Sequence, residues 1–184
     1  TGNVTVEDLT EDKADLATIA SYTDVILSST NITVTDDVNK SEVDIINTYN
    51  DAGGVVTVSS ITDKFSNISA VQETTGISIG TALITATDAV TLANANSLNG
   101  FTTAQVTLNA VQDTVSNITS INGIKTSEVS MAAAAVTVTD AATLANAKAI
   151  NNFTTGQVTL NIVKDTVDNI TSIDGLTTSE VSMA

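Results

Sequence analysis

The sequence predicts an α/β repeat solenoid, with a parallel β-sheet on one side and short helices on the other. This prediction rests on two observations. Residues 84–132 and 136–184 align without a gap at an offset of 52 residues, and 35 of the 49 aligned positions are identical. Each copy also contains two segments in which aliphatic residues alternate with Thr, and a helical pattern follows each segment. Strand, helix and strand in one direction form a βαβ crossover, which gives parallel strands.

A more divergent copy of the repeat lies upstream. ITVTD at 32–36 precedes ITATD at 84–88 by 52 residues, and VTVEDLTEDKADLATI opens the chain as a half-copy. We therefore divide the chain into a partial repeat at 1–31, a diverged repeat at 32–83, and repeats at 84–135 and 136–184. Each repeat has two similar halves, and the half-units begin near Val4, Ile32, Val56, Ile84, Val106, Val136 and Val158.

Each half-unit is predicted to open with a strand that buries one face. Apolar residues hold its first and third positions, and Thr holds the second position in all seven strands. We expect the seven segments to lie side by side and parallel. The apolar pairs are Val4/Val6, Ile32/Val34, Val56/Val58, Ile84/Ala86, Val106/Leu108, Val136/Val138 and Val158/Leu160, and the Thr residues are Thr5, Thr33, Thr57, Thr85, Thr107, Thr137 and Thr159.

An Asp follows each strand, where it is expected to cap the next helix by accepting hydrogen bonds from free backbone N–H groups. Asp36, Asp88 and Asp140 close the first kind of half-unit, and Asp12, Asp63, Asp113 and Asp165 close the second.

The helices are expected to be short. After Asp140, the residues Leu144, Ala147 and Ile150 fall on one helical face. After Asp165, apolar residues recur every third position at Val167, Ile170, Ile173 and Leu176, which favours a short or tight helical turn, and Gly123 and Gly175 are typical of a helix end. The competing architecture is two compact α/β domains of about two coils each, but no Pro- or Gly-rich linker separates the copies.

Composition excludes several functional classes. The formal net charge is −15 and there is no Arg, so neither nucleic acid nor an anionic membrane surface is expected as a partner. No apolar run approaches the roughly 20 residues that cross a bilayer. The chain has no His and no Cys, which removes the commonest general base and the thiolate ligands. We therefore expect no enzyme, no catalytic residue and no cofactor-binding residue, and we rank cleavage of glycosides by paired carboxylates last.

Three kinds of binding site are compatible with the sequence, and each has a competing structural explanation. The recurrent Asp residues could bind calcium or could cap helices. The N-terminal acids could bind calcium or could form a solvated acidic face. The sequence therefore assigns no residue as a metal ligand. Ice binding by the T-x-T pairs Thr33/Thr35, Thr85/Thr87 and Thr137/Thr139 competes with ordinary cross-strand Thr pairing, which is favoured. Glycosylation at Asn-x-Ser/Thr sites competes with a structural use of Asn. The N-terminal acids are Glu7, Asp8, Glu11, Asp12 and Asp15, and the Asn sites are Asn3, Asn31, Asn39, Asn67, Asn117 and Asn169.

One pattern resembles a known group of proteins. The segment VTVTD at 136–140, the Ala/Asn-rich helix after it and VTLNIVKDTVDNI at 158–170 resemble the tandem modules of giant secreted or cell-surface proteins of bacteria, including RTX-type adhesins and surface-layer-like proteins. The resemblance implies an extracellular or cell-surface location. The calcium nonapeptide GGxGxDxUx of that group is absent, so its calcium binding is not carried over to any residue here, and an intact leucine-rich repeat motif is also absent.

The sequence thus predicts a structural or adhesive repeat segment of a large extracellular bacterial protein, which acts as a spacer or as a surface-layer or adhesion module. Its expected partners are neighbouring repeats of the same protein and cell-surface or matrix components. The alternative is a calcium-binding repeat module, with ice binding ranked below it. Because the chain starts and stops within its own pattern, we also expect it to be part of a longer protein, with an imperfect end or end-to-end association when isolated.

Overall fold

The computed structural model describes residues 2–51, 53–124, 128–174 and 181–183, and it divides into two compact units. The first unit holds residues 1–84 and 101–104, and the second holds residues 85–100 and 105–184. Within the described residues, both units are mixed α/β, and every strand pair with a stated register is parallel. The predicted α/β class with parallel strands is therefore confirmed.

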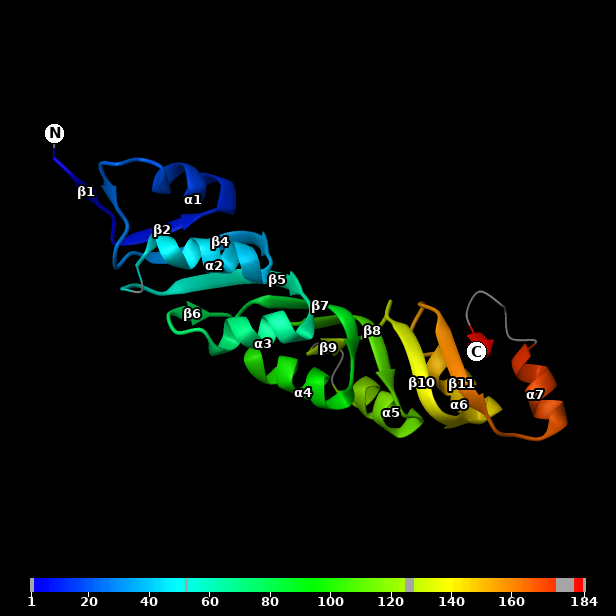
Figure 1. The fold of residues 1–184 in the computed structure, drawn as a ribbon. Helices are drawn as coiled ribbons and strands as arrows, with labels where there is room; N and C mark the ends of the chain where they lie inside the picture. The colour runs from blue at the N-terminus through cyan, green and yellow to red at the C-terminus, as the bar shows by residue number, and fades with distance from the viewer. Residues whose placement is uncertain (1, 52, 125–127, 175–180, 184) are drawn as a thin grey trace. The chain divides into compact units, whose positions relative to one another are not determined.

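The first unit alternates strands with short helices (Figure 1). Its sheet runs in the order β2-β4-β5, with β6 beside β5, while β1 and β3 pair separately. Neighbouring helices pack against one another and against β4 and β5. The elements are β1 (Val4–Thr5), β2 (Asp8–Glu11), α1 (Lys13–Ala20), β3 (Val25–Ile26), β4 (Asn31–Val38), α2 (Lys40–Tyr49), β5 (Val56–Asp63), α3 (Phe65–Glu73) and β6 (Ile77–Ser78).

The second unit repeats this arrangement. Its strands run in the order β7-β8-β10-β11-β12, with β9 beside β8, and α6 packs between α5 and α7. Strand β7 (Leu83–Val90) begins in the first unit and ends in the second, and α4 (Leu92–Phe101) lies almost wholly in the second. The other elements are β8 (Val106–Asp113), α5 (Val115–Gly123), β9 (Val129–Ser130), β10 (Ala135–Ala142), α6 (Leu144–Asn151), β11 (Val158–Val163), α7 (Val167–Asp174) and β12 (Val181–Met183).

The aliphatic positions of the strands form the core, as predicted. Because successive side chains in a strand point to opposite faces, the Val/Ile positions turn inward and the Thr positions turn outward. Ile32, Val34, Val56 and Val58 are fully buried in the first unit. Val106, Leu108, Val136, Val138, Val158 and Leu160 are at most 1% exposed in the second unit.

The predicted register holds within the repeats 32–83 and 136–184 and fails between the repeats 84–135 and 136–184. Ile32 lies opposite Val56, and Val136 lies opposite Val158, as expected. Between repeats, however, Val136 lies opposite Val111 and not Val106. The reason is that the first positions of β8 pair with the short strand β9, which the sequence pattern does not reveal because it contributes only two residues.

The assignment of Val4 as the first strand position of the sheet is wrong for the same reason. Val4 pairs with Val25 in the small sheet and is 57% exposed, whereas Leu9 takes the place beside Ile32. Thr5 likewise lies opposite Ile26, and Thr10 is the residue that aligns with Thr33.

The helix predictions hold with one correction. Ala147 and Ile150 are buried on one face of α6, and Leu144 begins that helix. The spacing after Asp165 favoured a tight turn, but α7 is a regular α-helix of eight residues. Helix α5 ends at Gly123 as predicted, while Gly175 and Leu176 lie outside the described residues.

Candidate functional site

The recurrent Asp residues join each half-unit to the one before it. Asp113, at the end of β8, accepts a hydrogen bond from the Leu92 N–H at the start of α4 (2.9 Å). Asp63 accepts from the Lys40 N–H at the start of α2, and Asp165 accepts from the Leu144 N–H at the start of α6, each at 2.9 Å. Helix starts carry unpaired N–H groups and a partial positive charge, so a carboxylate is well suited to this position.

These three residues, the strand-end aspartates Asp63, Asp113 and Asp165, each accept two more hydrogen bonds. The second donor is the backbone N–H of the next residue, at 2.8 Å in every case. The third donor is the side-chain amide of an Asn four residues later, namely Asn67, Asn117 or Asn169, at 2.8–2.9 Å. Three of the Asn-x-Ser/Thr positions are thus bonded within the fold, which agrees with the structural use of Asn that the repeat spacing favoured.

The hydrogen bonds lower the pKa of the strand-end aspartates. Partial burial alone raises the pKa of Asp63 and Asp113, but the donated N–H groups outweigh it, so that each pKa lies below the ordinary value of 3.8. The pKa of Asp165 is also lowered, chiefly by the hydrogen bond from Asn169. These carboxylates are therefore charged, and their oxygens are occupied by the protein's own donors.

A second set, the bulge aspartates Asp36 and Asp140, also accepts hydrogen bonds from the start of a preceding helix, but these residues lie within a strand and not at its end. In β10 the pairing with β11 shifts between Val138 and Ala141, so two residues of β10 oppose one residue of β11. Such a bulge redirects a side chain. Asp140 in this bulge accepts from the Val115 N–H at the start of α5 (2.8 Å), and Asp36, in the matching bulge of β4, accepts from the Lys13 N–H at the start of α1 (3.0 Å).

The strand-end and bulge aspartates therefore accept hydrogen bonds from backbone N–H groups at helix starts, as predicted, but the helix is the preceding one and not the following one. A later polar residue caps the following helix in α2, α5 and α6, whereas Lys64 at the start of α3 makes no side-chain capping hydrogen bond. Thr143 and Asn39 supply capping boxes for α6 and α2, and Thr114 caps α5. Asp12, in contrast, caps its own helix by accepting from the N–H groups of Ala14 and Asp15.

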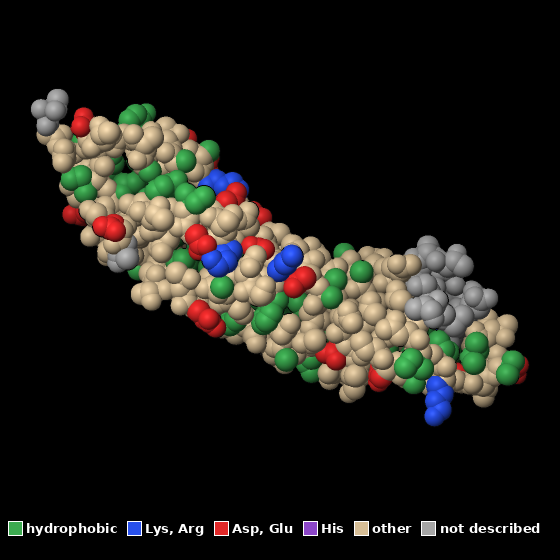
Figure 2. Space-filling model, viewed as in Figure 1, with side chains coloured by type: hydrophobic (Ala, Val, Ile, Leu, Met, Phe, Trp, Pro, Cys, Tyr) green, Lys and Arg blue, Asp and Glu red, His purple; other side chains and the backbone are tan. Residues whose placement is uncertain are grey.

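The N-terminal acids do not come together as a cation site. Asp8 accepts a hydrogen bond from the Asn31 side chain, and Asp12 is occupied at the start of α1. Across the part of the chain that the structure describes, no three His, Cys, Asp or Glu side chains group so as to hold a metal ion. Figure 2 shows the acidic side chains dispersed over the visible face, where some lie beside Lys.

The outward Thr residues form aligned rows, and the shifted register interrupts the row in the second unit. In the first unit Thr10, Thr33 and Thr57 lie opposite one another in adjacent strands, and Ser78 continues the row. In the second unit Gln112 lies beside Thr137, because of the shifted register, while Thr107 lies opposite Ser130. The continuous ladder of seven Thr residues expected from the sequence is therefore interrupted.

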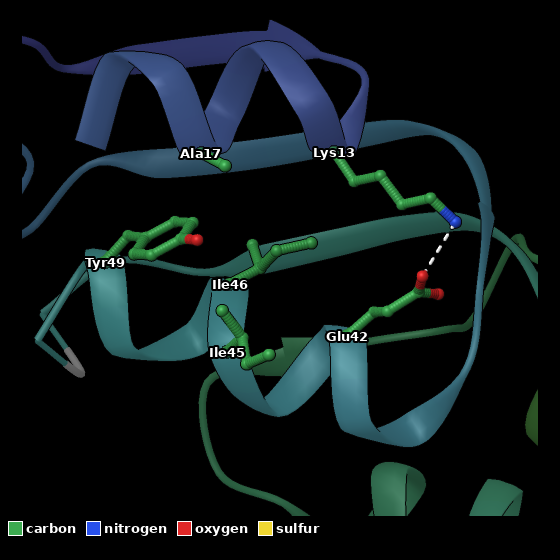
Figure 3. A pocket seen from close by; sticks show the side chains of 6 residues that line it. All are labelled: Lys13, Ala17, Glu42, Ile45, Ile46 and Tyr49. Atoms are coloured by element: carbon green, nitrogen blue, oxygen red, sulfur yellow. Dashed lines mark ion pairs between the residues drawn. The ribbon is translucent and has the colours of Figure 1, made fainter. Parts of the chain in front are cut away.

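The first unit also contains a groove of about 230 Å³ between α1 and α2 (Figure 3). The Lys13 ammonium bridges one end of it, 2.9 Å from a Glu42 carboxylate oxygen. Glu42, Ile45, Ile46 and Tyr49 form the α2 wall, and Ala17 lies on the α1 side. The hydrogen bond from Lys13 lowers the pKa of Glu42, and the same bond raises the pKa of Lys13.

Sequence reasoning missed this groove. The spacing of Glu42, Ile45, Ile46 and Tyr49 places all four on one helical stripe, which is a visible signal.

Comparison with known protein families, with curated proteins and with solved structures found no match. No described helix is long and apolar enough to cross a membrane.

Proposed function

We propose that this chain is a structural repeat segment of a large extracellular protein, in which it serves as a spacer or as an adhesion module. The observation that supports this most is the use of the recurrent residues. The carboxylates of Asp63, Asp113 and Asp165 each accept three hydrogen bonds from groups within the fold. Residues repeated for catalysis or ligand binding would keep free atoms directed toward solvent.

The hydrogen bonds also make each half-unit depend on the next one. The helices have only eight to ten residues, and helices of this length are marginal in isolation. In each of α1, α2, α4, α5 and α6, the first backbone N–H donates to an Asp within or just after the next long strand along the chain, namely β4, β5, β8, β10 and β11 respectively. Such nearest-neighbour dependence is typical of repeat proteins, whose stability grows as units are added.

The proposed architecture is a solenoid in which every half-unit adds one long strand. It is tested by inserting a second copy of residues 84–135 after Ala135 and measuring both proteins by small-angle X-ray scattering. Adjacent strands lie about 4.8 Å apart, so two further strands lengthen the particle by about 10 Å at constant cross-section. A flexible Gly/Ser insert of equal length is the matched control. Growth of the cross-section without an increase in length would refute the solenoid.

The extracellular location and the adhesive role follow from the resemblance to bacterial surface modules and need their own test. An antibody against the chain is expected to label intact cells of the source organism without permeabilisation. Labelling that appears only after permeabilisation would contradict the location, and with it the role as a surface spacer.

A further inference from the structure

Strand β11 and helix α7 of the second unit expose a surface whose equivalent on β8 and α5, in the preceding repeat, is covered. Val167, at the start of α7, is 78% exposed, and Ile162 in β11 is 52% exposed. Their equivalents in the repeat alignment, Val115 and Ala110, are only partly exposed. Val163 is likewise half-buried, whereas its equivalent Val111 is 1% exposed. The two surfaces are built from nearly the same sequence, so their difference comes from what covers them.

The structure shows what covers the surface formed by β8 and α5. Strand β10 pairs with the second half of β8 in parallel, with Ala135 opposite Ala110 and Val136 opposite Val111. Helix α5 packs on β10, and the Val115 N–H donates to Asp140 of that strand. The cover is thus a strand of the pattern apolar-Thr-apolar-Thr-Asp, which bonds to both the sheet edge and the helix start.

The edge of β11 is prepared in the same way as the edge of β8. Strand β12 pairs with Val158, Thr159 and Leu160, just as β9 pairs with the first residues of β8. Among the described residues, no strand pairs with Ile162 or Val163 on the side that β12 occupies. In the part of the chain that the structure describes, the position equivalent to the β8–β10 pairing is therefore unfilled.

We propose that this open face of β11 and α7 receives a further half-unit of the β10–α6 kind, supplied in cis by a following repeat. Its strand would pair in parallel with Ile162 and Val163, and its Asp would accept the hydrogen bond from the Val167 N–H. This inference rests on the proposed function, because it assumes that half-units associate through the same contacts throughout.

A second copy of the chain is a poorer occupant than a following repeat. The strand at the other end of the chain, β1 with β2, aligns with β5, β8 and β11 and not with β10. It is incomplete on its outer side, where Val4 is 57% exposed while its equivalent Val56 is fully buried. Two copies meeting end to end would place two strands of the same kind together, and Glu7, Asp8 and Glu11 would enter the contact without the Asp that the β10 pattern provides.

The test extends the chain with a copy of residues 133–157 placed after Ala184, since Ala184 is the equivalent of Ala132. Amide hydrogen exchange is followed by NMR at Val167, with Val115 as the internal reference for a folded second unit. The expected result is exchange at Val167 slowed by at least about tenfold relative to the unextended chain. The control extension carries Asp140→Ala in the appended copy, which should remove most of this protection while Val115 stays protected.

Two outcomes would overturn the proposal. The first is equal exchange at Val167 in the unextended, extended and control chains. The second is concentration-dependent protection of Val167 in the unextended chain together with dimer formation in sedimentation, which would assign the face to a second copy. Asp140→Ala in the original β10 shows whether a negative result concerns this inference alone or also the proposed function. If this variant speeds hydrogen exchange at the Val115 amide while the extension does not slow exchange at Val167, only this inference fails. If it leaves Val115 protected, the inter-unit contacts behind the proposed function fail too.

Discussion

Asp113 shows how one residue connects three segments of the chain. Its carboxylate holds the start of α4 (Leu92 N–H), the start of its own half-unit's helical segment (Thr114 N–H) and the Asn117 amide within α5. Each hydrogen bond is 2.8–2.9 Å long, and the residue is only partly exposed. Hydrogen bonds to a charged acceptor in such a setting are stronger than those between neutral groups.

We expect Asp113→Ala to lower the free energy of unfolding by about 2–3 kcal/mol, because three donors lose a charged acceptor. Urea denaturation followed by circular dichroism measures the change. The matched control is Asp24→Ala, an exposed acid in a turn, which should change stability by less than about 0.5 kcal/mol. Equal free energies of unfolding for the two variants would show that the hydrogen bonds to Asp113 do not contribute to stability.

The strand-end aspartates also predict a dependence of stability on pH. Their pKa values are lowered in the folded protein, so their contribution is complete above the ordinary Asp pKa of 3.8 and is lost as the pH falls through the lowered folded value. The melting temperature is therefore expected to be level from pH 7 to about 5 and to drop steeply below pH 4. Differential scanning calorimetry from pH 3 to 7 measures this profile.

Asp113→Asn provides the comparison for that profile. The amide keeps an acceptor oxygen but does not titrate, so the variant should start less stable at pH 7 and lose less stability on acidification. A drop as steep as that of the original chain would mean that other carboxylates cause the acid sensitivity.

In the long strands β4 and β10, the alternating residues form the core, and a β-bulge directs an Asp toward a helix. The regular alternation buries Val136 and Val138 in β10, and the bulge that follows directs Asp140 toward α5. The same sequence of features occurs in β4, where Asp36 reaches α1. An uninterrupted strand would keep strict alternation and would lose this freedom to aim the side chain.

Val138→Asp is expected to unfold the second unit or to destabilise it by at least about 3 kcal/mol, because a charge would be buried without a partner. Thr139→Asp is the matched control: the next residue is exposed, and the same side chain there should cost less than about 1 kcal/mol. Chemical denaturation of both variants decides the assignment of the inward face. Cooperative unfolding of Val138→Asp at the original midpoint would contradict it.

At the scale of the whole molecule, the net charge is −15, and among the described residues no three acidic side chains group so as to hold a metal ion. The strand-end and bulge aspartates bind backbone N–H groups, which leaves them poorly arranged as ligands for calcium, an ion that takes six to eight oxygen atoms. The net negative charge is instead expected to act at long range, because it favours solubility and repels anions.

Millimolar calcium is accordingly expected to leave the melting temperature within about 1 °C of its value in EDTA, since specific binding at 100 times the dissociation constant would add about 2.7 kcal/mol of stability. Magnesium at the same concentration controls for ionic strength. A calcium-specific rise of several degrees, accompanied by heat in titration calorimetry, would instead support the calcium-binding alternative.

Some of the structure was readable at the level of single residues. The burial of Val136 and Val158, and their pairing, follow from period-two alternation, because one face of a strand must leave water. The structural use of Asn67, Asn117 and Asn169 followed from their equivalent places in the repeats. The short strands β3, β6 and β9 were not predictable, because two residues carry no periodicity.

The α/β class, the parallel strands, the aliphatic core and the positions at which charged residues recur are all predictable from the amino-acid sequence. These follow from local patterns, since alternation and helical spacing depend only on neighbouring residues. The shifted register between repeats, the groove between α1 and α2, and the partners of the strand-end and bulge aspartates become visible only when the folded chain is known. A carboxylate at the end of a strand finds several N–H groups within reach, and the arrangement of adjacent half-units in space selects the helix of the preceding one.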